Sequence, residues 1–464
     1  MLNQSGIMKI VFFLVLSLGL TGTLTAQADS TYLSLDDCIV LALEKNTDLK
    51  SAEYTYETAD VNVKSSYSGI LPVVSASASK GKYIEGASEV IGPIQVDDSL
   101  GNAITVIGTD RRPKYEQDYN SAGISINQNL FDGGIWWNRI RQAKTDRQSS
   151  EYYLMNERNR TILTTKEAFY DLNKQIQLLV ANQAAVQRSQ GQLERTEKMF
   201  ELGATARLDV YRAKVNLGND RITMLNQKNI VESARKKLNI IMGRDPLTPL
   251  EIQSVPQVKE ELPPIEEITE NTEEINPTLK RYEEDIHSRD LTVSMAKGVY
   301  YPELSASFNY SRSNPDMDRV YSSQLNEDYS ARYGLSLSIN LFNGFRDYVN
   351  VQKAKISKKN TEEQYENYRR NLKANIVQNY NDYYSMLDII KINEQNLEAA
   401  REEMRLSEER YQIGAGTSLD VRESQVNLSR AEQTLIAAQY NALLLYAQLQ
   451  YQIGASYENF TENK

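Results

Sequence analysis

The stretch that decides the fold runs Met199-Phe200-Glu201-Leu202-Gly203-Ala204, followed shortly by Leu208-Asp209-Val210. It recurs 211 residues later as Arg410-Tyr411-Gln412-Ile413-Gly414-Ala415, followed by Leu419-Asp420-Val421. In both places a glycine interrupts a long stretch without proline, and an aspartate stands near the start of the next stretch. This pattern is typical of a helix that ends at glycine, turns and continues as a second helix. Its recurrence indicates an internal repeat.

The offset extends well beyond this motif. It maps Leu130-Phe131-Asp132-Gly133 onto Leu341-Phe342-Asn343-Gly344, while an offset of 230 maps residues 46–50 onto 276–280. The change of offset predicts a loop that is 19 residues longer in the first copy. We divide the chain into repeat 1 (29–244), an irregular linker rich in proline and glutamate (245–275), repeat 2 (276–455) and a tail (456–464).

Apolar residues seven positions apart run through both copies, as in Leu179, Val186, Leu193 and Phe200, then Leu217, Met224, Val231 and Leu238. Apolar residues that keep a spacing of seven over several helical turns predict a coiled-coil seam. We expect helical hairpins at 134–243, with its tip near 203–207, and at 345–454, with its tip near 414–418. The arm before each tip would be roughly 100 Å long and the returning arm only about half of that. Short helices at 35–67 and 276–299 are expected to complete the shorter arms, in an order that the sequence leaves open.

Four other segments, in strand hairpins at about 71–131 and 302–342, alternate strictly between apolar and small polar residues. An example is Leu335-Ser336-Leu337-Ser338-Ile339. An uncharged polar face opposite an apolar face predicts strands with water on one side and lipid on the other. A soluble sandwich with its core on the apolar face is the alternative. The position of the strands as two isolated hairpins between long helices favours the membrane.

Four strands cannot close a membrane barrel, and an open sheet edge is not tolerated in lipid. The chain is therefore expected to oligomerise. A trimer would supply twelve strands and a dimer the minimum of eight. The sequence thus predicts an α+β fold in which a β-barrel is continued by a long antiparallel coiled-coil helical tube.

Composition excludes several other classes of protein. The 464 residues carry a net charge of −10 and no long Lys/Arg run, so nucleic acid is not an expected partner. A single histidine, His287, and a single cysteine, Cys38, argue against a metal centre, a catalytic triad or a disulfide framework. We expect neither an enzyme nor a cofactor. Residues 1–28, with an apolar run at 10–20 and Ala26-Gln27-Ala28, predict a secretory signal peptide that begins at Met1 or Met8.

The two tip motifs and both strand-to-helix junctions, Phe131 with Gly133 and Phe342 with Gly344, resemble those of the TolC-like outer-membrane efflux proteins. The resemblance covers nearly the whole mature chain. It implies a homotrimer in the outer membrane of a Gram-negative bacterium, with a twelve-stranded barrel and a periplasmic helical tunnel. The linker and the tail would form an equatorial region around that tunnel.

The same resemblance implies a gate at the periplasmic tip. Asp420 matches an acidic ring of the pore, and Glu423 stands where a second acid is usual. Tyr411 matches a tyrosine that closes the pore, and Asp209 matches its partner on the other hairpin. An aspartate in the first turn of a helix is also favoured by the helix dipole alone, so Asp209 has a purely structural alternative. The sequence departs from the family at Gly416, where a basic residue is common.

The tips also resemble the places where such channels meet a periplasmic adaptor coupled to an inner-membrane pump of the RND or ABC type. The residues concerned are Gly203, Ala204, Thr205, Leu208, Gly414, Ala415, Gly416, Thr417 and Leu419. The implied function is a passive export duct, and the sequence does not name its substrate. A soluble periplasmic coiled-coil protein is the alternative.

Overall fold

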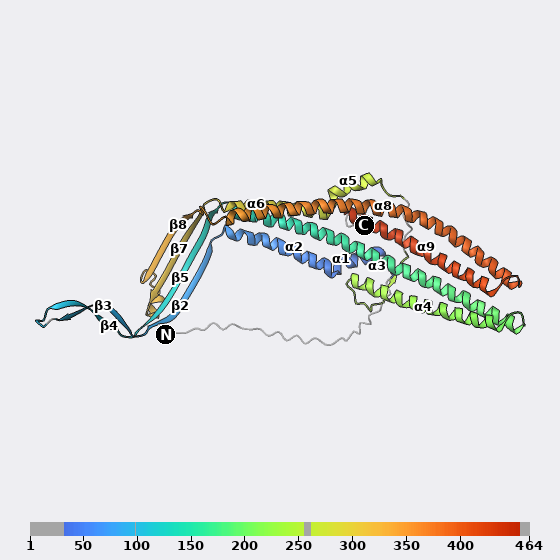
Figure 1. The fold of residues 1–464 in the computed structure, drawn as a ribbon, viewed down its shortest axis with the longest axis horizontal. Coiled ribbons are helices and arrows are strands. Elements are labelled where there is room, and N and C mark those ends of the chain that lie inside the picture. Colours follow the sequence, from blue (N-terminus) through green and yellow to red (C-terminus); the bar gives the residue numbers. More distant parts are fainter. Residues whose placement is uncertain (1–31, 98, 255–260, 455–464) are drawn as a thin grey trace, which may run out of the picture.

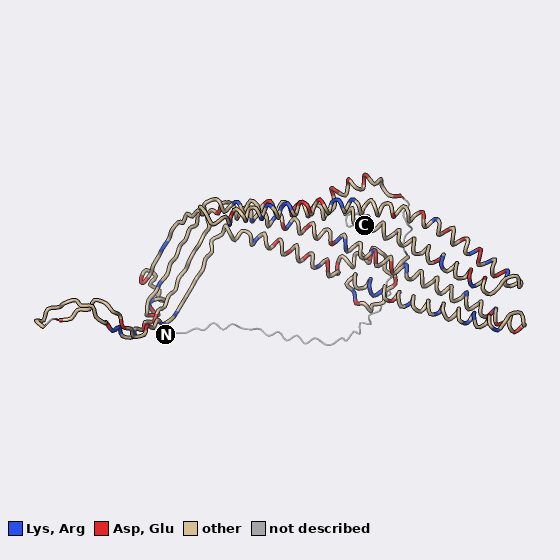
Figure 2. Tube along the Cα trace, in the orientation of Figure 1, with Lys and Arg blue, Asp and Glu red and all other residues tan. Residues whose placement is uncertain are grey.

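The structure, a computed structural model, describes residues 32–97, 99–254 and 261–454. The chain is elongated, with a small sheet at one end and a long helical body that reaches the other end (Figure 1). The predicted signal peptide (1–28) and tail (456–464) lie outside the described residues. Charged side chains are spread along the helices (Figure 2).

The main sheet has four antiparallel strands in the order β2–β5–β7–β8. They are β2 (Val73–Glu85), β5 (Tyr115–Asp132), β7 (Glu303–Asn314) and β8 (Tyr329–Ser338). The register aligns the alternation across all four strands. One row of neighbours is Val74, Ile126, Phe308 and Tyr333, and the adjacent row is Ser75, Ser125, Asn309 and Arg332. The sheet therefore has one apolar face and one polar face, as the alternation predicts.

The expected long loop of the first copy is instead a separate β-ribbon. β3 (Ser88–Asp97) pairs with β4 (Ala103–Arg112) over ten residue pairs, and the ribbon projects beyond the main sheet (Figure 1). The prediction of a loop was wrong because β-branched residues alternate through both segments, as in Val90, Ile94 and Val96. A bend at residues 86–87 separates β2 from β3.

Two helical hairpins form the body. α3 (Ile135–Glu201) returns as α4 (Arg207–Ile241), and α8 (Arg346–Gln412) returns as α9 (Ser418–Ile453). Residues of the predicted seams are buried between the arms: Leu193 and Leu217 belong to one apolar cluster, and Leu397 and Leu428 belong to another. The two long helices have 67 residues each and are roughly 100 Å long.

The short helices continue the returning arms end to end, which the sequence left open. Asn46 caps α2 (Thr47–Ser66), and its Nδ2 donates to the Ile241 carbonyl at the end of α4, at 3.0 Å. Asn276 caps α6 (Pro277–Gly298) in the same way, and its Nδ2 donates to the Gln452 carbonyl at 2.7 Å. Each asparagine thus joins a short helix to the end of α4 or α9. The helix α1 (Leu35–Lys45) packs beside α3.

The segment predicted as an irregular linker contains regular structure. β6 (Glu251–Ile252) pairs with β1 (Tyr32–Leu33), and α5 (Ile265–Ile275) lies against α8 and α9 (Figure 1). The apolar residues of α5 recur at helical spacing, and Ile268 is buried against Leu279 and Ile376. The abundance of proline nearby masked this helix. Two short elements complete the described chain: the 3₁₀ turn η1 (Tyr67–Gly69) and α7 (Met317–Val320).

The largest apolar cluster lies near the middle of the body. It gathers Cys38, Phe169, Leu172 and Leu238, with Leu250 beside β6. Burial raises the pKa of the Cys38 thiol to about 12, with nearby Asp37 adding to the effect. The only cysteine of the sequence is therefore a packed, protonated side chain, as its position on an amphipathic helix predicts.

The junction at Asn276 gives a stability prediction. Asn276→Ala removes the Oδ1 that accepts from the Thr278 and Leu279 amides and the Nδ2 that donates to Gln452, so we expect a loss of about 1–3 kcal/mol. Asn276→Asp keeps a cap acceptor and loses the donor, so it should recover part of that loss. Denaturant unfolding followed by circular dichroism measures both, with the exposed Asn396→Ala on α8 as the control. Equal stability of Asn276→Ala and the control would contradict the role of this junction.

Candidate functional site

The site that the sequence predicts lies at the two helical turns farthest from the sheet. Gly203 ends α3 with a φ of 75°, and Gly414 ends α8 with a φ of 74°. Each turn is closed by the same bond, from the Ala204 amide to the Met199 carbonyl and from the Ala415 amide to the Arg410 carbonyl, both at 2.8 Å. Glycine adopts this left-handed conformation without strain, which is why both helices stop there.

Asp420 lies in the first turn of α9 and forms a capping box with Thr417, the N-cap residue of that helix. Its Oδ2 accepts from the Thr417 amide at 2.9 Å, while the Thr417 hydroxyl accepts from the Asp420 amide at 3.2 Å. These bonds from Thr417 lower the pKa of Asp420, with a smaller contribution from Arg410. The carboxylate stays exposed, and so does Glu423 one turn further along α9. Asp420 is therefore charged, accessible and fixed in position at the tip.

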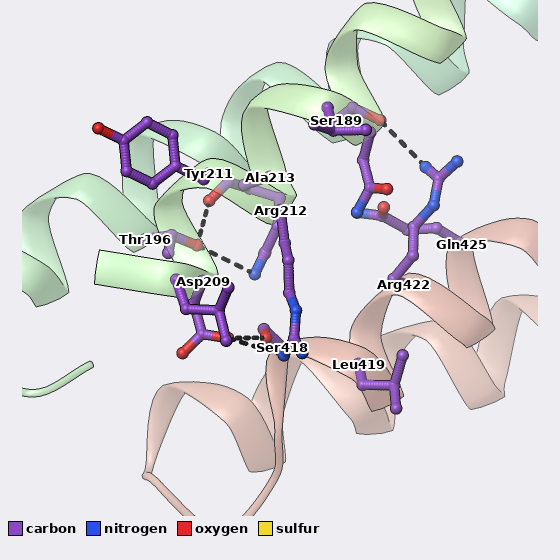
Figure 3. A pocket seen from close by; sticks show the side chains of 14 residues that line it. Ser189, Thr196, Asp209, Tyr211, Arg212, Ala213, Ser418, Leu419, Arg422 and Gln425 are labelled. Atoms are coloured by element: carbon purple, nitrogen blue, oxygen red, sulfur yellow. Dashed lines mark hydrogen bonds and ion pairs between the residues drawn. The ribbon is translucent and has the colours of Figure 1, made fainter. Parts of the chain in front are cut away.

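Asp209 joins the two hairpins. Its carboxylate accepts from the Ser418 hydroxyl of α9 at 3.0 Å (Figure 3). It also accepts from the Thr205 hydroxyl of its own turn at 3.0 Å. Arg212 lies 3.6 Å away. Partial burial opposes ionisation, but the two hydroxyls and Arg212 together hold the pKa of Asp209 below its usual value. Asp209 thus connects the two hairpins, in addition to the favourable interaction that any acid in the first turn of a helix has with the helix dipole.

Tyr411 lies in the apolar seam between α8 and α9, where its side chain is buried against Met404 and Val421. Its hydroxyl lies 3.4 Å from the Thr196 hydroxyl on α3. The expected pair of Tyr411 with Asp209 is therefore replaced by two separate contacts, Tyr411 with Thr196 and Asp209 with Ser418. The reason is the buried position of the tyrosine ring, which points its hydroxyl at α3.

Three arginines that sequence reasoning missed also tie the hairpins together. Arg422 of α9 binds Asp220 of α4 through two bonds, at 2.8 and 3.0 Å. Arg188 and Arg195 of α3 reach the second hairpin at Glu432, 3.1 Å away, and Glu408, 2.8 Å away. The spacing of seven between Arg188 and Arg195 was the signal that could have placed both on one face of α3.

At Gly416, where the family often has a basic residue, the neighbouring Arg410 supplies a positive charge. A Cβ at this position would lie 3.2 Å from the Arg410 Cβ and equally close to the Tyr411 amide nitrogen. The Arg410 guanidinium donates to the Ala415 carbonyl at 3.2 Å. A cation is therefore present at this turn, but it is supplied by the end of α8 and bonds to its own turn.

A cavity of about 410 Å³ lies between the two hairpins beside these contacts (Figure 3). Leu208, Val215 and Leu419 form apolar walls, and Gln425 and Arg422 supply polar groups. Leu208 and Leu419, both predicted as contact residues, are exposed at its edge. The remaining predicted tip residues, Gly203, Ala204, Thr205, Gly414, Ala415 and Thr417, form the turns themselves.

The predicted strand-to-helix junctions lie at the opposite end of the helical body. Gly133 has a φ of 72°, and a Cβ there would overlap the Gly298 carbonyl oxygen at the end of α6. Gly344 has a φ of 69° and open space around it. Phe131 and Phe342 are exposed beside these turns. Glycine at both junctions lets the chain turn from strand into helix.

Within the described ranges, His, Cys, Asp and Glu side chains do not gather into a group able to hold a metal ion. In the same ranges no helix combines the length and the apolar character needed to cross a bilayer.

The contact of Asp209 with Ser418 predicts a pH-dependent contribution to stability. Because the pKa of Asp209 is lowered on folding, its stabilisation is present above the unfolded value of about 3.9 and is lost as the pH falls through the folded value. Asp209→Asn should lower the melting temperature at neutral pH and leave it unchanged at about pH 2. Asp388→Asn, an exposed change on α8, is the control. A deficit of Asp209→Asn that persists unchanged in acid would contradict this account.

Known proteins share both the sequence and the fold. A model of the outer membrane efflux protein family matches residues 38–244 and 269–455. The outer membrane protein TolC of Vibrio cholerae is 22% identical over 388 residues, which cover 82% of this chain and 87% of TolC. A probable efflux pump outer membrane protein of Pseudomonas putida, TtgC, is 21% identical over 444 residues, covering 91% and 83% of the two chains.

Among solved structures, the Campylobacter jejuni CmeC outer membrane channel superposes with a TM-score of 0.76 at 19% identity, covering 92% of this chain and 88% of CmeC. This likeness shows the same fold. The family match spans most of the chain, includes both tips and leaves out residues 245–268 of the linker. The resemblance of the tip motifs is thereby confirmed: the chain belongs to the outer membrane efflux protein family.

Proposed function

We propose that this chain is one protomer of a trimeric export channel that carries substrates across the outer membrane. Three four-stranded sheets would close a twelve-stranded barrel, and the helical hairpins would continue it as a tunnel through the periplasm. The observation that carries the proposal is the sheet, which has an apolar face, a small polar face and, among the described residues, no partner for the outer edges of β2 and β8. In lipid both edges require partners.

The faces of the sheet support a membrane position. Tyr333, Leu335 and Leu337 of β8 expose most of their surface on the apolar face. The opposite face presents serine, asparagine and glycine, which suit a water-filled lumen. A soluble sandwich would need a second layer over the apolar face, and the described helices leave it open (Figure 1). The alternative of a soluble coiled-coil protein is therefore not favoured.

The internal repeat supports closure of the helical tube by other copies. Within the chain α9 packs against α3, where Gln433 donates to Asn182 and Glu432 binds Arg188. Gln433 and Ile436 of α9 lie on the side that faces α3, and the offset of 211 carries them onto Ile222 and Leu225 of α4, which are exposed. We infer that α8 of the next copy covers Ile222 and Leu225.

The tip is the proposed gate. Three copies of Asp420 and Glu423 around the axis would form a negative constriction that attracts cations. Asp209 and Tyr411 hold the second hairpin against the first through Ser418 and Thr196, and Arg422 does so through Asp220. Opening would separate the hairpins at these contacts. Opening would break these half-buried ion pairs and expose them to water. The closed state is therefore the more stable one until a partner binds.

The remaining tip residues are the proposed contact surface for a periplasmic adaptor and, through it, an inner-membrane pump. Leu202, Ile413 and Leu419 expose between 68% and 84% of their surface at the turns. Apolar groups held out in this way are typical of a docking surface. The channel would supply a passive path and leave the energy to the pump.

The acidic ring is tested by conductance in planar bilayers. Asp420→Asn should lower cation selectivity and weaken block by multivalent cations, because three negative charges leave the constriction. With the pKa of Asp420 lowered, wild-type selectivity should persist down to a pH below the usual aspartate value of about 3.9. Glu270→Gln on α5 is the control. Unchanged selectivity and block in Asp420→Asn would refute the ring.

The ion pair of Arg422 with Asp220 is tested in the same conductance assay. Arg422→Gln leaves the half-buried Asp220 without its charged partner, at a cost of about 1–3 kcal/mol to the closed arrangement. The fraction of time that the channel is open should rise severalfold. Arg430→Gln, an exposed change two turns along α9, should have no effect. If both variants open as often as the wild type does, the ion pair of Arg422 with Asp220 does not stabilise the closed state.

A further inference from the structure

The β3–β4 ribbon is an element that the proposed channel does not use. It continues from β2 and β5 beyond the sheet (Figure 1), and β3 pairs with β4 from Ser88 to Asp97. Within the described residues the two strands pack mainly on each other. An isolated two-stranded ribbon is only marginally stable in water unless one face packs against something else. The ribbon therefore requires a partner.

The register gives the ribbon two unlike faces. One, here called the aliphatic face, carries Gly92 and Gly108 among five β-branched residues, Val90, Ile94, Val96, Ile104 and Val106, with Asp110 opposite Val90 at its base. Ile94 lies directly over Gly108. The opposite face mixes Gln95, Thr105 and Thr109 with apolar residues. Alternation of this kind marks a sheet with one buried face.

Charge is confined to the ends of the ribbon. Residues 90–96 and 103–109 contain no charged side chain. Glu89, Asp110, Arg111 and Arg112 cluster at the base, between the ribbon and the main sheet (Figure 2). This charged belt separates the aliphatic face from the apolar rows that would contact lipid. A lipid partner is therefore disfavoured, because charges at that level belong outside the hydrocarbon layer.

The corresponding loop of the second half is covered by its own chain. Arg312 of β7 is only 4% exposed and donates to the carbonyls of Arg319 and Ser322 and, at 3.2 Å, of Glu327. These bonds hold the loop and α7 against the sheet. The ribbon has no such tether among the described residues, and Val96 and Ile104 remain 42% and 44% exposed. Both faces of the ribbon are thus uncovered: Ile91 and Ile107 of the opposite face are 78% and 83% exposed, and the aliphatic face presents the larger set of apolar side chains.

We propose that the aliphatic faces of three ribbons, one from each copy, pack together on the threefold axis and cover the outer mouth of the barrel. This inference rests on the proposed trimer. A barrel of twelve tilted strands has a radius of about 12 Å, while a strand of ten residues extends about 33 Å. Each ribbon is therefore long enough to reach the axis, where symmetry brings three identical apolar faces together.

Packing by faces fits the sequence better than pairing by edges. Pro93 lies in the middle of β3 and lacks the amide hydrogen that a ladder needs. Proline on an edge strand also discourages pairing with other chains. The glycine pair Gly92 and Gly108 leaves room for Ile94 beside the axis. The three ribbons would form a second barrier, at the end of the channel opposite the helical gate.

Crosslinking of cysteine variants tests the arrangement. Val106→Cys lies on the aliphatic face, and Ile107→Cys is its neighbour on the opposite face. Cys38, the only native cysteine, is fully buried, so the introduced thiol alone should react. A short homobifunctional maleimide applied to intact cells should link pairs of Val106→Cys chains and leave Ile107→Cys chains single. Equal behaviour of the two variants in an intact trimer would overturn the inference.

Conductance gives an independent readout. Val106→Asp would place three like charges beside the axis, so the ribbons should separate and the conductance should rise. Ile107→Asp adds the same charge to the outward face and should leave the conductance unchanged. Equal conductance of both variants, in channels that still form trimers, would overturn the inference. Absence of trimers in the wild type would instead overturn the proposed function.

Discussion

A β-sheet cannot end inside a lipid bilayer, and this constraint governs the rest of the molecule. Four strands bring an apolar face and a row of small polar residues, but the edges of β2 and β8 have no partner within the described chain. Unpaired amides and carbonyls in hydrocarbon cost several kcal/mol each. In the proposed trimer, closure by further copies of the chain would remove both edges at once, and the number of copies would be part of the fold.

The helical body meets a related requirement in water. Each long helix of 67 residues must bury its apolar positions along its full length, although the arm that returns beside it is about half as long. Asn46 and Asn276 solve this by joining a short helix to the end of each returning arm. A second set of positions, exposed on α4, remains for the neighbouring copy. In the proposed trimer, the geometry that builds one protomer would also prepare the contact between protomers.

At the tips the two hairpins meet through polar contacts. The seams within each hairpin are apolar, as Tyr411 and Val421 show. Between the hairpins lie charged and hydroxyl groups, among them Asp209, Ser418 and the pair of Arg422 with Asp220. Such contacts can be exchanged for water at modest cost. The hairpins are therefore packed firmly within themselves and separable from each other, as the proposed gate would require.

Sequence reasoning reached the parts of the structure that local patterns determine. The positions of Gly203 and Gly414 predicted both tips. The strict alternation of apolar and polar residues predicted which side chains share a face in all four main strands. Sequence reasoning missed the β3–β4 ribbon, because a change of repeat offset shows that residues are inserted but does not show their conformation. It also missed α5, because prolines are abundant in the segment that contains this helix. Arg422 and Asp220 could not be paired from sequence, because the lateral register of α9 against α4 depends on packing between separate hairpins. The same packing turned Tyr411 toward Thr196.

The central claim, closure by three copies, is tested most directly by mass. The protein would be extracted from outer membranes in detergent and measured by light scattering, with the detergent contribution subtracted. A protein mass three times that of the mature chain is the predicted result. A twofold mass would imply an eight-stranded closure, and a single chain released without detergent would contradict the membrane channel itself.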